Sequence, residues 1–155
     1  MNKGVIECTI NVNHIDGTDY LNFKIVLDNE TKVDEYVSVG IHKYTVEFDE
    51  ELVITNRVIQ FIINGKTDSH TIIENGNVVD SETIEILNLS FSDTDVTKHV
   101  LGMKMGLDVA SYTHDFNGHG ESETIPFDQL MGFNGVGEIK FVAPIYIWAM
   151  DIFSR

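Results

Sequence analysis

The stretch "VIECTINVNHIDGTDYLNFKIVL", residues 5–27, decides the fold class of this chain. Apolar and polar residues alternate on both sides of Asp16-Gly17, and this alternation places the apolar side chains of a strand on one face. The apolar members are Ile6, Cys8, Ile10 and Val12 before the turn and Leu21, Phe23, Ile25 and Leu27 after it. Because Asp-Gly favours a tight turn, the pattern predicts a β-hairpin with one buried face.

The same alternation recurs along the chain, in "KYTVEF" (43–48), "RVIQFII" (57–63) and "GEIKFVA" (137–143). Asn-Gly dipeptides at 64–65, 75–76, 117–118 and 134–135 lie between such runs, and both residue types tolerate the positive φ of a type I′ turn. After Gly65 we expect Lys66 and Thr67 to begin the next strand. These patterns predict an all-β fold, an antiparallel jelly-roll-like β-sandwich of about eight strands.

Asn75-Gly76 is the clearest of these turns. It separates "SHTIIE" (69–74) from "NVVDSETIEILNLSF" (77–91), in which the apolar spacing changes once. Ile84 and Ile86 alternate on one side of the change and Leu89 and Phe91 on the other, which indicates a strand with one irregularity.

The C-terminal segment departs from strand periodicity. Pro144 suits the first turn of a helix, and the apolar residues that follow have helical spacing: Ile145, Trp148, Ala149, Ile152 and Phe153. We expect a short C-terminal helix whose apolar face either caps the sandwich's own core or docks on a neighbouring subunit. A strand through "IYIWAM" (145–150) is the local alternative.

Length and charge limit the classes of function. A chain of 155 residues fits a single domain, 1–155, and a net charge of -15 disfavours nucleic acid and anionic membranes as partners. No apolar run reaches membrane-spanning length, so we expect no membrane insertion. The single cysteine, Cys8, lies in an alternating run, and we expect it in the core and in no internal disulfide.

The chain lacks the motifs of common enzyme classes. It has no G-x-S-x-G turn for a nucleophile and no complete phosphate-binding loop. We therefore expect a protein that is not an enzyme. Four histidines stand alone in the sequence and are expected at the surface or in strand pairs: His14, His42, His70 and His99.

One stretch, "THDFNGHGESET" (113–124), concentrates polar chemistry. We expect no cofactor other than calcium, which the oxygen donors of this stretch suit, and the candidate ligands are Asp115, Asn117, Glu121 and Glu123 together with Asp128 just beyond it. Residues suited to contact a glycan or a protein partner are Tyr112, His114, Phe116 and His119. A transition metal held by the two imidazoles, as in a hydrolase using His114, Asp115 and His119, is the remotest alternative. The simplest alternative is a solvated loop.

Candidate calcium ligands and sugar-stacking aromatic side chains also occur elsewhere in the chain. Acidic turns in "EFDEEL" (47–52) and "LDNETKVDE" (27–35) also supply oxygen ligands. Further aromatic side chains that suit sugar stacking are Tyr36, Tyr44 and Trp148.

The order of several segments resembles small structural virion proteins of marine tailed bacteriophages, especially those that infect cyanobacteria. The resemblance spans roughly residues 40–155 and rests on "HKYTVEFDEEL", "RVIQFIINGKTDSHTIIENGNVVDSETIEILNLSF", "YTHDFNGH" and "FNGVGEIKFVAPIYIWAMDIF". The positions that match are Asn134, Gly135, Phe141, Pro144, Tyr146 and Trp148. The chain departs from the pattern at Ala149 and Asp151. The middle section also resembles the jelly-roll sandwich of calcium-dependent carbohydrate-binding modules.

The first resemblance implies a non-enzymatic virion component, either a capsid decoration protein or part of a tail or neck fibre. It implies protein partners within the virion, a homo-oligomer or symmetric array, and assembly in the host cytoplasm. The second resemblance implies the alternative, a calcium-assisted module that contacts host surface glycans.

Overall fold

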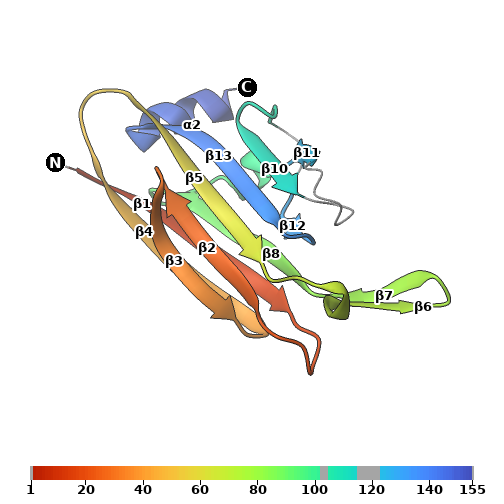
Figure 1. The fold of residues 1–155 in the computed structure, drawn as a ribbon. Coiled ribbons are helices and arrows are strands. Elements are labelled where there is room, and N and C mark those ends of the chain that lie inside the picture. Colours follow the sequence, from red (N-terminus) through yellow and green to blue (C-terminus); the bar gives the residue numbers. More distant parts are fainter. Residues whose placement is uncertain (1, 102–104, 115–122, 155) are drawn as a thin grey trace.

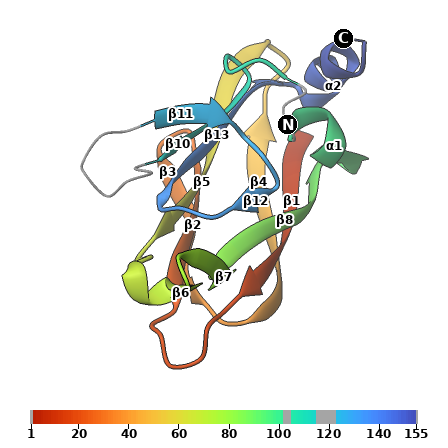
Figure 2. The ribbon, with the colours of Figure 1, turned by 90° about the vertical axis from the view of Figure 1, so that its right-hand side faces the viewer.

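The fold is a sandwich of two antiparallel sheets (Figures 1 and 2). The computed structural model describes residues 2–101, 105–114 and 123–154. Sheet A has the order β12-β8-β1-β4, with β9 paired to β8, and comprises β1 (Asn2–Asn13), β4 (Gly40–Glu50), β8 (Thr83–Phe91), β9 (Thr94–Asp95) and β12 (Leu130–Met131). The expected jelly-roll-like all-β sandwich is confirmed.

Sheet B has six strands in the order β11-β10-β13-β5-β2-β3. Its members are β2 (Leu21–Leu27), β3 (Glu30–Val37), β5 (Thr55–Asn64), β10 (Ala110–His114), β11 (Glu123–Pro126) and β13 (Gly135–Ala143). A separate hairpin consists of β6 (Thr71–Glu74) and β7 (Asn77–Ser81), and the helical elements are α1 (Thr97–Val100), α2 (Ile145–Phe153) and a 3-10 turn, Asp68–His70. The described residues thus form more strands than the eight expected, because short edge strands carry no periodic signal.

The core lies between the sheets and is built from the alternating residues. Ile6, Cys8, Ile10 and Val12 of β1 face Leu21, Phe23, Ile25 and Leu27 of β2, and all eight side chains are buried. The alternating residues of β4 and β5 also face inward: Val46, Phe48, Ile59, Phe61 and Ile63 are buried, and Tyr44 is partly buried against the core. Burial of Cys8 raises the pKa of its thiol to about 12.

The connection from β1 to β2 is not the hairpin that Asp16-Gly17 predicted. β1 pairs with β4 and β8 in sheet A, whereas β2 pairs with β3 and β5 in sheet B. Residues 14–20 therefore carry the chain from one sheet to the other across the end of the sandwich (Figure 1). Two strands that each have one apolar face bury those faces equally well by facing each other, and the alternation alone does not distinguish the two arrangements.

Of the Asn-Gly dipeptides, Asn75-Gly76 forms the expected hairpin turn. Both residues have positive φ, 53° and 79°, as a type I′ turn requires. Gly65 also has positive φ, but Lys66 and Thr67 begin no strand and lead into the 3-10 turn, so that expectation was wrong. The irregularity expected between Ile86 and Leu89 is confirmed, because Thr9 and Ile10 of β1 pair with Asn88 and Ile86 and the register shifts between them. Residues 77–81 form a separate strand, β7, that ends before β8 begins.

Helix α2 closes the end of the sandwich opposite the β6–β7 hairpin (Figure 1). Its buried residues are Ile145, Trp148 and Ile152, and the Trp148 ring lies 4.8 Å from that of Phe91 and 5.9 Å from that of Phe141. The segment is a helix rather than a strand, and its apolar face packs on the chain's own core. None of the helices in the described part of the chain is long and apolar enough to span a membrane.

Candidate functional site: a projecting hairpin and its buried polar root

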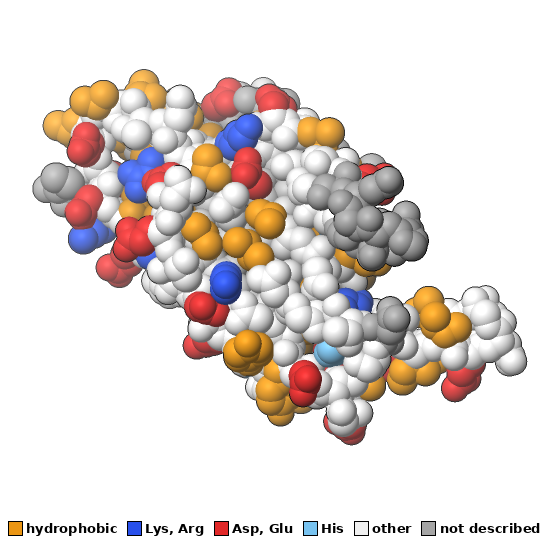
Figure 3. Space-filling view, viewed as in Figure 1, with side chains coloured by type: hydrophobic (Ala, Val, Ile, Leu, Met, Phe, Trp, Pro, Cys, Tyr) orange, Lys and Arg blue, Asp and Glu red, His pale blue; other side chains and the backbone are white. Residues whose placement is uncertain are grey.

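The β6–β7 hairpin projects from the sandwich with its aliphatic side chains in solvent (Figures 1 and 3). We call residues 71–81 the arm. Its exposed apolar side chains are Ile72, Ile73, Val78 and Val79, with exposed fractions of 38%, 61%, 64% and 53%. Ile73 and Val78 are register partners across the two strands, so they form one apolar pair next to the turn. This pair is a candidate contact for another protein.

The root of the arm is a buried polar cluster centred on Glu82, which follows β7 directly and is 1% exposed. Its Oε1 accepts hydrogen bonds from the backbone N–H of Ile15, at 2.9 Å, and from the hydroxyl of Thr18. The same oxygen lies 2.7 Å from Nδ1 of His14. The carboxylate therefore joins the arm to the β1–β2 connection.

His70 fastens the other side of the root. Its Nδ1 accepts the backbone N–H of Thr67 at 2.9 Å, so Nε2 carries the ring proton and donates to the carbonyl of Asp19 at 2.8 Å. Nε2 also lies 3.5 Å from Oε2 of Glu82. His70, just before β6, and Glu82, just after β7, are thus both joined to the connection between β1 and β2.

Lys66 completes the cluster from the end of β5. Its Nζ donates to Oγ of Ser81 at 2.6 Å, to the carbonyl of Glu82 at 2.7 Å and to the carbonyl of Gly132 at 2.5 Å. Burial lowers the pKa of this amine, and the nearby Glu82 carboxylate opposes that shift. An ammonium with three acceptors holds the arm in one direction relative to the sandwich.

This cluster was not visible in the sequence. His14 and His70 were expected as separate surface or strand-pairing residues, but both contact Glu82. The three residues are far apart in the chain and match no spacing motif, so no local signal joins them. Only the crossing of the β1–β2 connection over the arm's root brings them together.

The polar stretch 113–124 is described only in part. Asp115, Phe116, Asn117, His119 and Glu121 lie outside the described residues, so the calcium site and the remote hydrolase site stay predictions. The other two candidate ligands are exposed: Glu123 begins β11, and Asp128 accepts the backbone N–H of Gln129 at 2.7 Å. Among the described residues, no group of three or more His, Cys, Asp or Glu side chains could hold a metal ion.

The two described contact candidates of this stretch lie in the core. Tyr112 is 4% exposed and its hydroxyl donates to the carbonyl of Phe133, while His114 is 2% exposed and stacks on the Phe133 ring at 5.0 Å. Burial raises the pKa of the Tyr112 hydroxyl. In this conformation neither side chain offers a surface to a glycan or a partner.

The C-terminal docking residues divide into two groups. Pro144, Ile145, Trp148 and Ile152 are buried in the chain's own core, whereas Phe153 is 43% exposed and its ring lies 4.1 Å from that of His99. The structure thus assigns the first four to core docking.

Carboxylates of the two acidic segments, 47–52 and 27–35, pair within the chain, and Asp49 and Glu50 lie in strand β4 rather than in the expected turn. Asp49 pairs with Lys3 at 2.7 Å, Asp28 pairs with Arg57, and a Glu50 oxygen accepts the first N–H of α2 at 2.6 Å.

Comparisons with known proteins give little further guidance. No family model matches the chain, and no curated protein matches it. A solved structure described as "vCBM60 in complex with galactobiose" is similar, with a TM-score of 0.43 and 9% sequence identity, covering 87% of this chain and 96% of that one.

Proposed function

We propose that this protein is a non-enzymatic structural component of a bacteriophage virion, a capsid decoration protein or part of a tail or neck fibre, that acts through protein–protein contacts. The observation that carries the proposal is the arm, a projecting hairpin with an exposed aliphatic pair, Ile73 and Val78. A two-stranded hairpin is marginally stable in water, and exposed apolar area is stabilised when a partner covers it.

The anchored root supports an interaction role. Ordering a projecting segment costs conformational entropy, and a contact forms more tightly when that cost has been met before binding. The hydrogen bonds of Glu82, His70 and Lys66 orient the arm before any partner arrives. A rigid arm of this kind suits a protein that repeats in an assembly.

The resemblance of residues 40–155 to phage structural proteins supports the finer assignment to a virion. A two-layer sandwich is a rigid module that symmetry can repeat. The net charge of -15 suits a part that faces the medium rather than packaged DNA.

The test substitutes the apolar pair of the arm. In Ile73→Thr/Val78→Thr the β-branched shape stays, so the hairpin is retained while its apolar surface is lost. Val39→Thr/Ile41→Thr is a matched control, because these residues are 65% and 63% exposed and lie outside the arm, against 61% and 64% for the pair. We expect the arm variant, and not the control, to lose incorporation into purified phage particles, measured by mass spectrometry. Absence of the wild-type protein from particles would refute the virion assignment.

Carbohydrate binding is the second candidate, and the arrangement at Tyr36 favours it. Tyr36 is 74% exposed at the edge of sheet B and is the register partner of Asn22. The buried Asn22 amide donates to Oδ1 of the exposed Asp34 at 2.9 Å and so holds this carboxylate beside the ring. An exposed ring beside an exposed carboxylate suits stacking and hydrogen bonding to a sugar.

A glycan array tests this candidate. We expect any binding to be lost in Tyr36→Ala and kept in Tyr146→Ala, which removes another exposed tyrosine, 67% exposed on α2. Thermal melts with calcium and with EDTA test the calcium-assisted form, since a bound ion raises the melting temperature. A glycan array without binding, together with identical melting temperatures in calcium and in EDTA, would refute the carbohydrate-binding candidate.

A further inference from the structure

Strand β4 is an open edge of sheet A. It pairs with β1 on one side, and no strand in the described part of the chain pairs with it on the other. Its register with β1 runs along all eleven of its residues without a shift. The remaining sandwich edges are short or irregular: β9 and β12 have two residues each, β11 has four, and the β2–β3 register shifts between Ile25 and Val26. A long, regular edge presents a row of backbone N–H and C=O groups that can pair with another strand.

The outer face of β4 carries charges of both signs in a self-complementary order. Val46 and Phe48 point into the core, so the residues that alternate with them, Lys43, Thr45 and Glu47, are exposed on the outer face. Lys43 lies two residues before Thr45, and Glu47 lies two residues after it. Neither charged side chain forms an ion pair with another described residue of its own chain.

Two copies of β4 match when they pair antiparallel about Thr45. Side chains directly opposite each other in an antiparallel pair lie on the same face, so each outward residue of one copy meets an outward residue of the other. In this register Lys43 of each copy stands opposite Glu47 of the other, and the two threonines face each other at the centre. Opposite charges and paired threonines both stabilise neighbouring strands.

The charges favour this register over its neighbours. A centre at Val46 sets Lys43 opposite Asp49, whose carboxylate is already paired with Lys3 at 2.7 Å. A centre at Tyr44 sets Lys43 opposite a threonine and leaves it without a charged partner. The register centred between these two therefore joins the two side chains that have no ion pair within their own copy.

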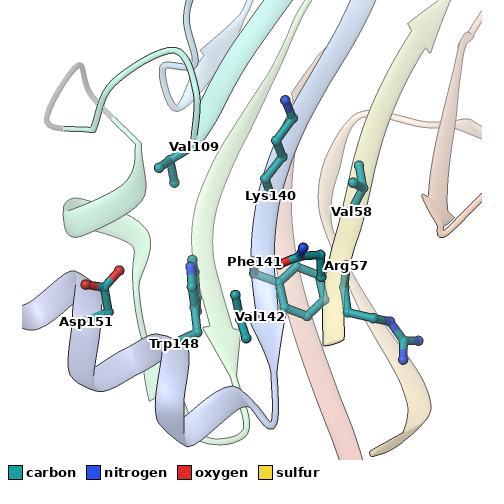
Figure 4. Close-up of a pocket in the computed structure, with 9 residues that line it drawn as sticks. Arg57, Val58, Val109, Lys140, Phe141, Val142, Trp148 and Asp151 are labelled. Carbon is teal, nitrogen blue, oxygen red and sulfur yellow. The ribbon is translucent and has the colours of Figure 1, made fainter. Parts of the chain in front are cut away.

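The recess beside α2 suits a second copy less well than this edge. It lies between α2 and strands β5 and β13, has a volume of about 380 Å³, and is lined largely by core side chains, among them Val109, Phe141 and Trp148 (Figure 4). Beside the second half of β4, by contrast, Glu47 and Phe48 line a recess of about 400 Å³. Open space thus adjoins the edge where the other strand would pair.

We propose that two copies of this protein associate through β4 of each, antiparallel about a two-fold axis at Thr45, so that sheet A continues from one copy into the other. The contact joins the same surface of both copies, so it is isologous and closes at two. Because each copy carries -15, the two pairs of Lys43 with Glu47 place unlike charges where the copies meet. The contact goes beyond the proposed function, since it needs neither the arm nor a virion.

A single cysteine at the centre of the pairing tests the contact on the full-length protein. In Thr45→Cys the two new thiols face each other across the axis, at a Cα separation of about 4.5 to 5.5 Å, which a disulfide spans. Oxidation should therefore convert most of the protein to a disulfide-linked dimer, measured by non-reducing gel electrophoresis and intact mass. Cys8 is buried in every variant, and the oxidised wild-type protein supplies the background.

Two further cysteine variants check the position of the axis. Ile41→Cys lies on the same exposed face four residues before Thr45, so its thiols are separated by eight residues of strand, roughly 27 Å. Glu7→Cys replaces the register partner of Thr45 on β1, so its thiols are separated by three strand spacings, roughly 14 Å. Neither variant should cross-link. Cross-linking of either one as efficient as that of Thr45→Cys would overturn the proposed register.

Charge reversal tests the pairing of Lys43 with Glu47. Glu47→Lys should weaken dimerisation roughly ten-fold in analytical ultracentrifugation, because two like-charge pairs replace two ion pairs. Net charge does not explain this result, since the substitution moves it from -15 to -13 and reduces repulsion between copies. Glu7→Lys makes the same change of charge one strand away from the edge and should not weaken dimerisation. The double variant Lys43→Glu/Glu47→Lys should restore it, and a double variant as weak as Glu47→Lys would contradict the pairing.

The outcomes separate this inference from the proposed function. A wild-type protein that stays monomeric in ultracentrifugation, together with no cross-link in Thr45→Cys, overturns the inference and leaves the test of the arm in particles unaffected. A Thr45→Cys dimer formed by a protein that is absent from particles supports the inference and refutes the virion assignment. The control variant of that test, Val39→Thr/Ile41→Thr, keeps β-branched side chains and the backbone of β4, so it leaves this contact in place.

Discussion

Glu82 is the residue on which the arm depends most. Its side chain is 1% exposed. Its carboxylate accepts hydrogen bonds from Ile15 and Thr18 and contacts two histidines, His14 and His70. A buried carboxylate is tolerated only where such donors surround it, because its desolvation is otherwise too costly. The same hydrogen bonds that make Glu82 tolerable in the core fix the direction of the arm.

We therefore expect Glu82→Gln to destabilise the protein by roughly 2 to 4 kcal/mol, because an amide replaces hydrogen bonds to a charged acceptor and sets an N–H group against buried donors. Urea denaturation followed by circular dichroism measures the loss. Glu7→Gln makes the same chemical change at an exposed position on β1 and should leave the free energy of unfolding within about 0.5 kcal/mol. Equal stabilities of the two variants would contradict this account of the root.

At the scale of elements, helix α2 buries one side against the sandwich and exposes the other. Ile145, Trp148 and Ile152 pack inward, whereas Tyr146 and Met150 are 67% and 71% exposed. The helix begins after Pro144, and the Glu50 carboxylate accepts its first free N–H. The sheet-facing side of α2 thus belongs to the core, and its outer side is exposed to solvent.

Trp148→Ala should lower the free energy of unfolding by about 3 to 5 kcal/mol, because it removes the ring that packs on Phe91 and Phe141. Met150→Ala is the control on the exposed side of the same helix and should change stability by less than about 1 kcal/mol. Thermal unfolding of both variants provides the comparison. A Trp148→Ala protein as stable as Met150→Ala would mean that α2 contributes little to the core.

For the whole molecule, the ionisable groups placed in and around the core decide how the fold responds to alkali. Burial raises the pKa of Cys8 from 9.0 to about 12, and burial is also the main cause that raises the pKa of Tyr44 and Tyr112. A group whose folded pKa is raised stabilises the fold below its unfolded pKa, and this stability is lost as pH rises toward the folded pKa. Lys66, whose pKa is lowered, acts in the opposite direction.

We expect the free energy of unfolding to fall between pH 9.0 and about 12, with Cys8 contributing up to about 1.4 kcal/mol per pH unit. Urea titrations at several pH values in this range measure the slope. The slope should be shallower in Cys8→Ala, which removes the thiol but leaves both tyrosines. An unchanged slope in that variant would show that the Cys8 thiol does not set the alkaline response. Because Cys8 lies on β1 between β4 and β8, its thiol should react with reagents only after global unfolding.

Local sequence patterns determined the fold class, the inward faces of the main strands, the Asn75-Gly76 turn and the helix after Pro144. Each follows from neighbouring residues, through the alternation of a strand, the positive φ of a tight turn or the spacing of a helix. Tertiary structure alone decided that β1 and β2 face each other across the core, that Tyr112 and His114 are buried, and that His14 and His70 meet at Glu82. These outcomes depend on which strands pair and on contacts between residues distant in the chain, and periodicity within a segment carries no information about either.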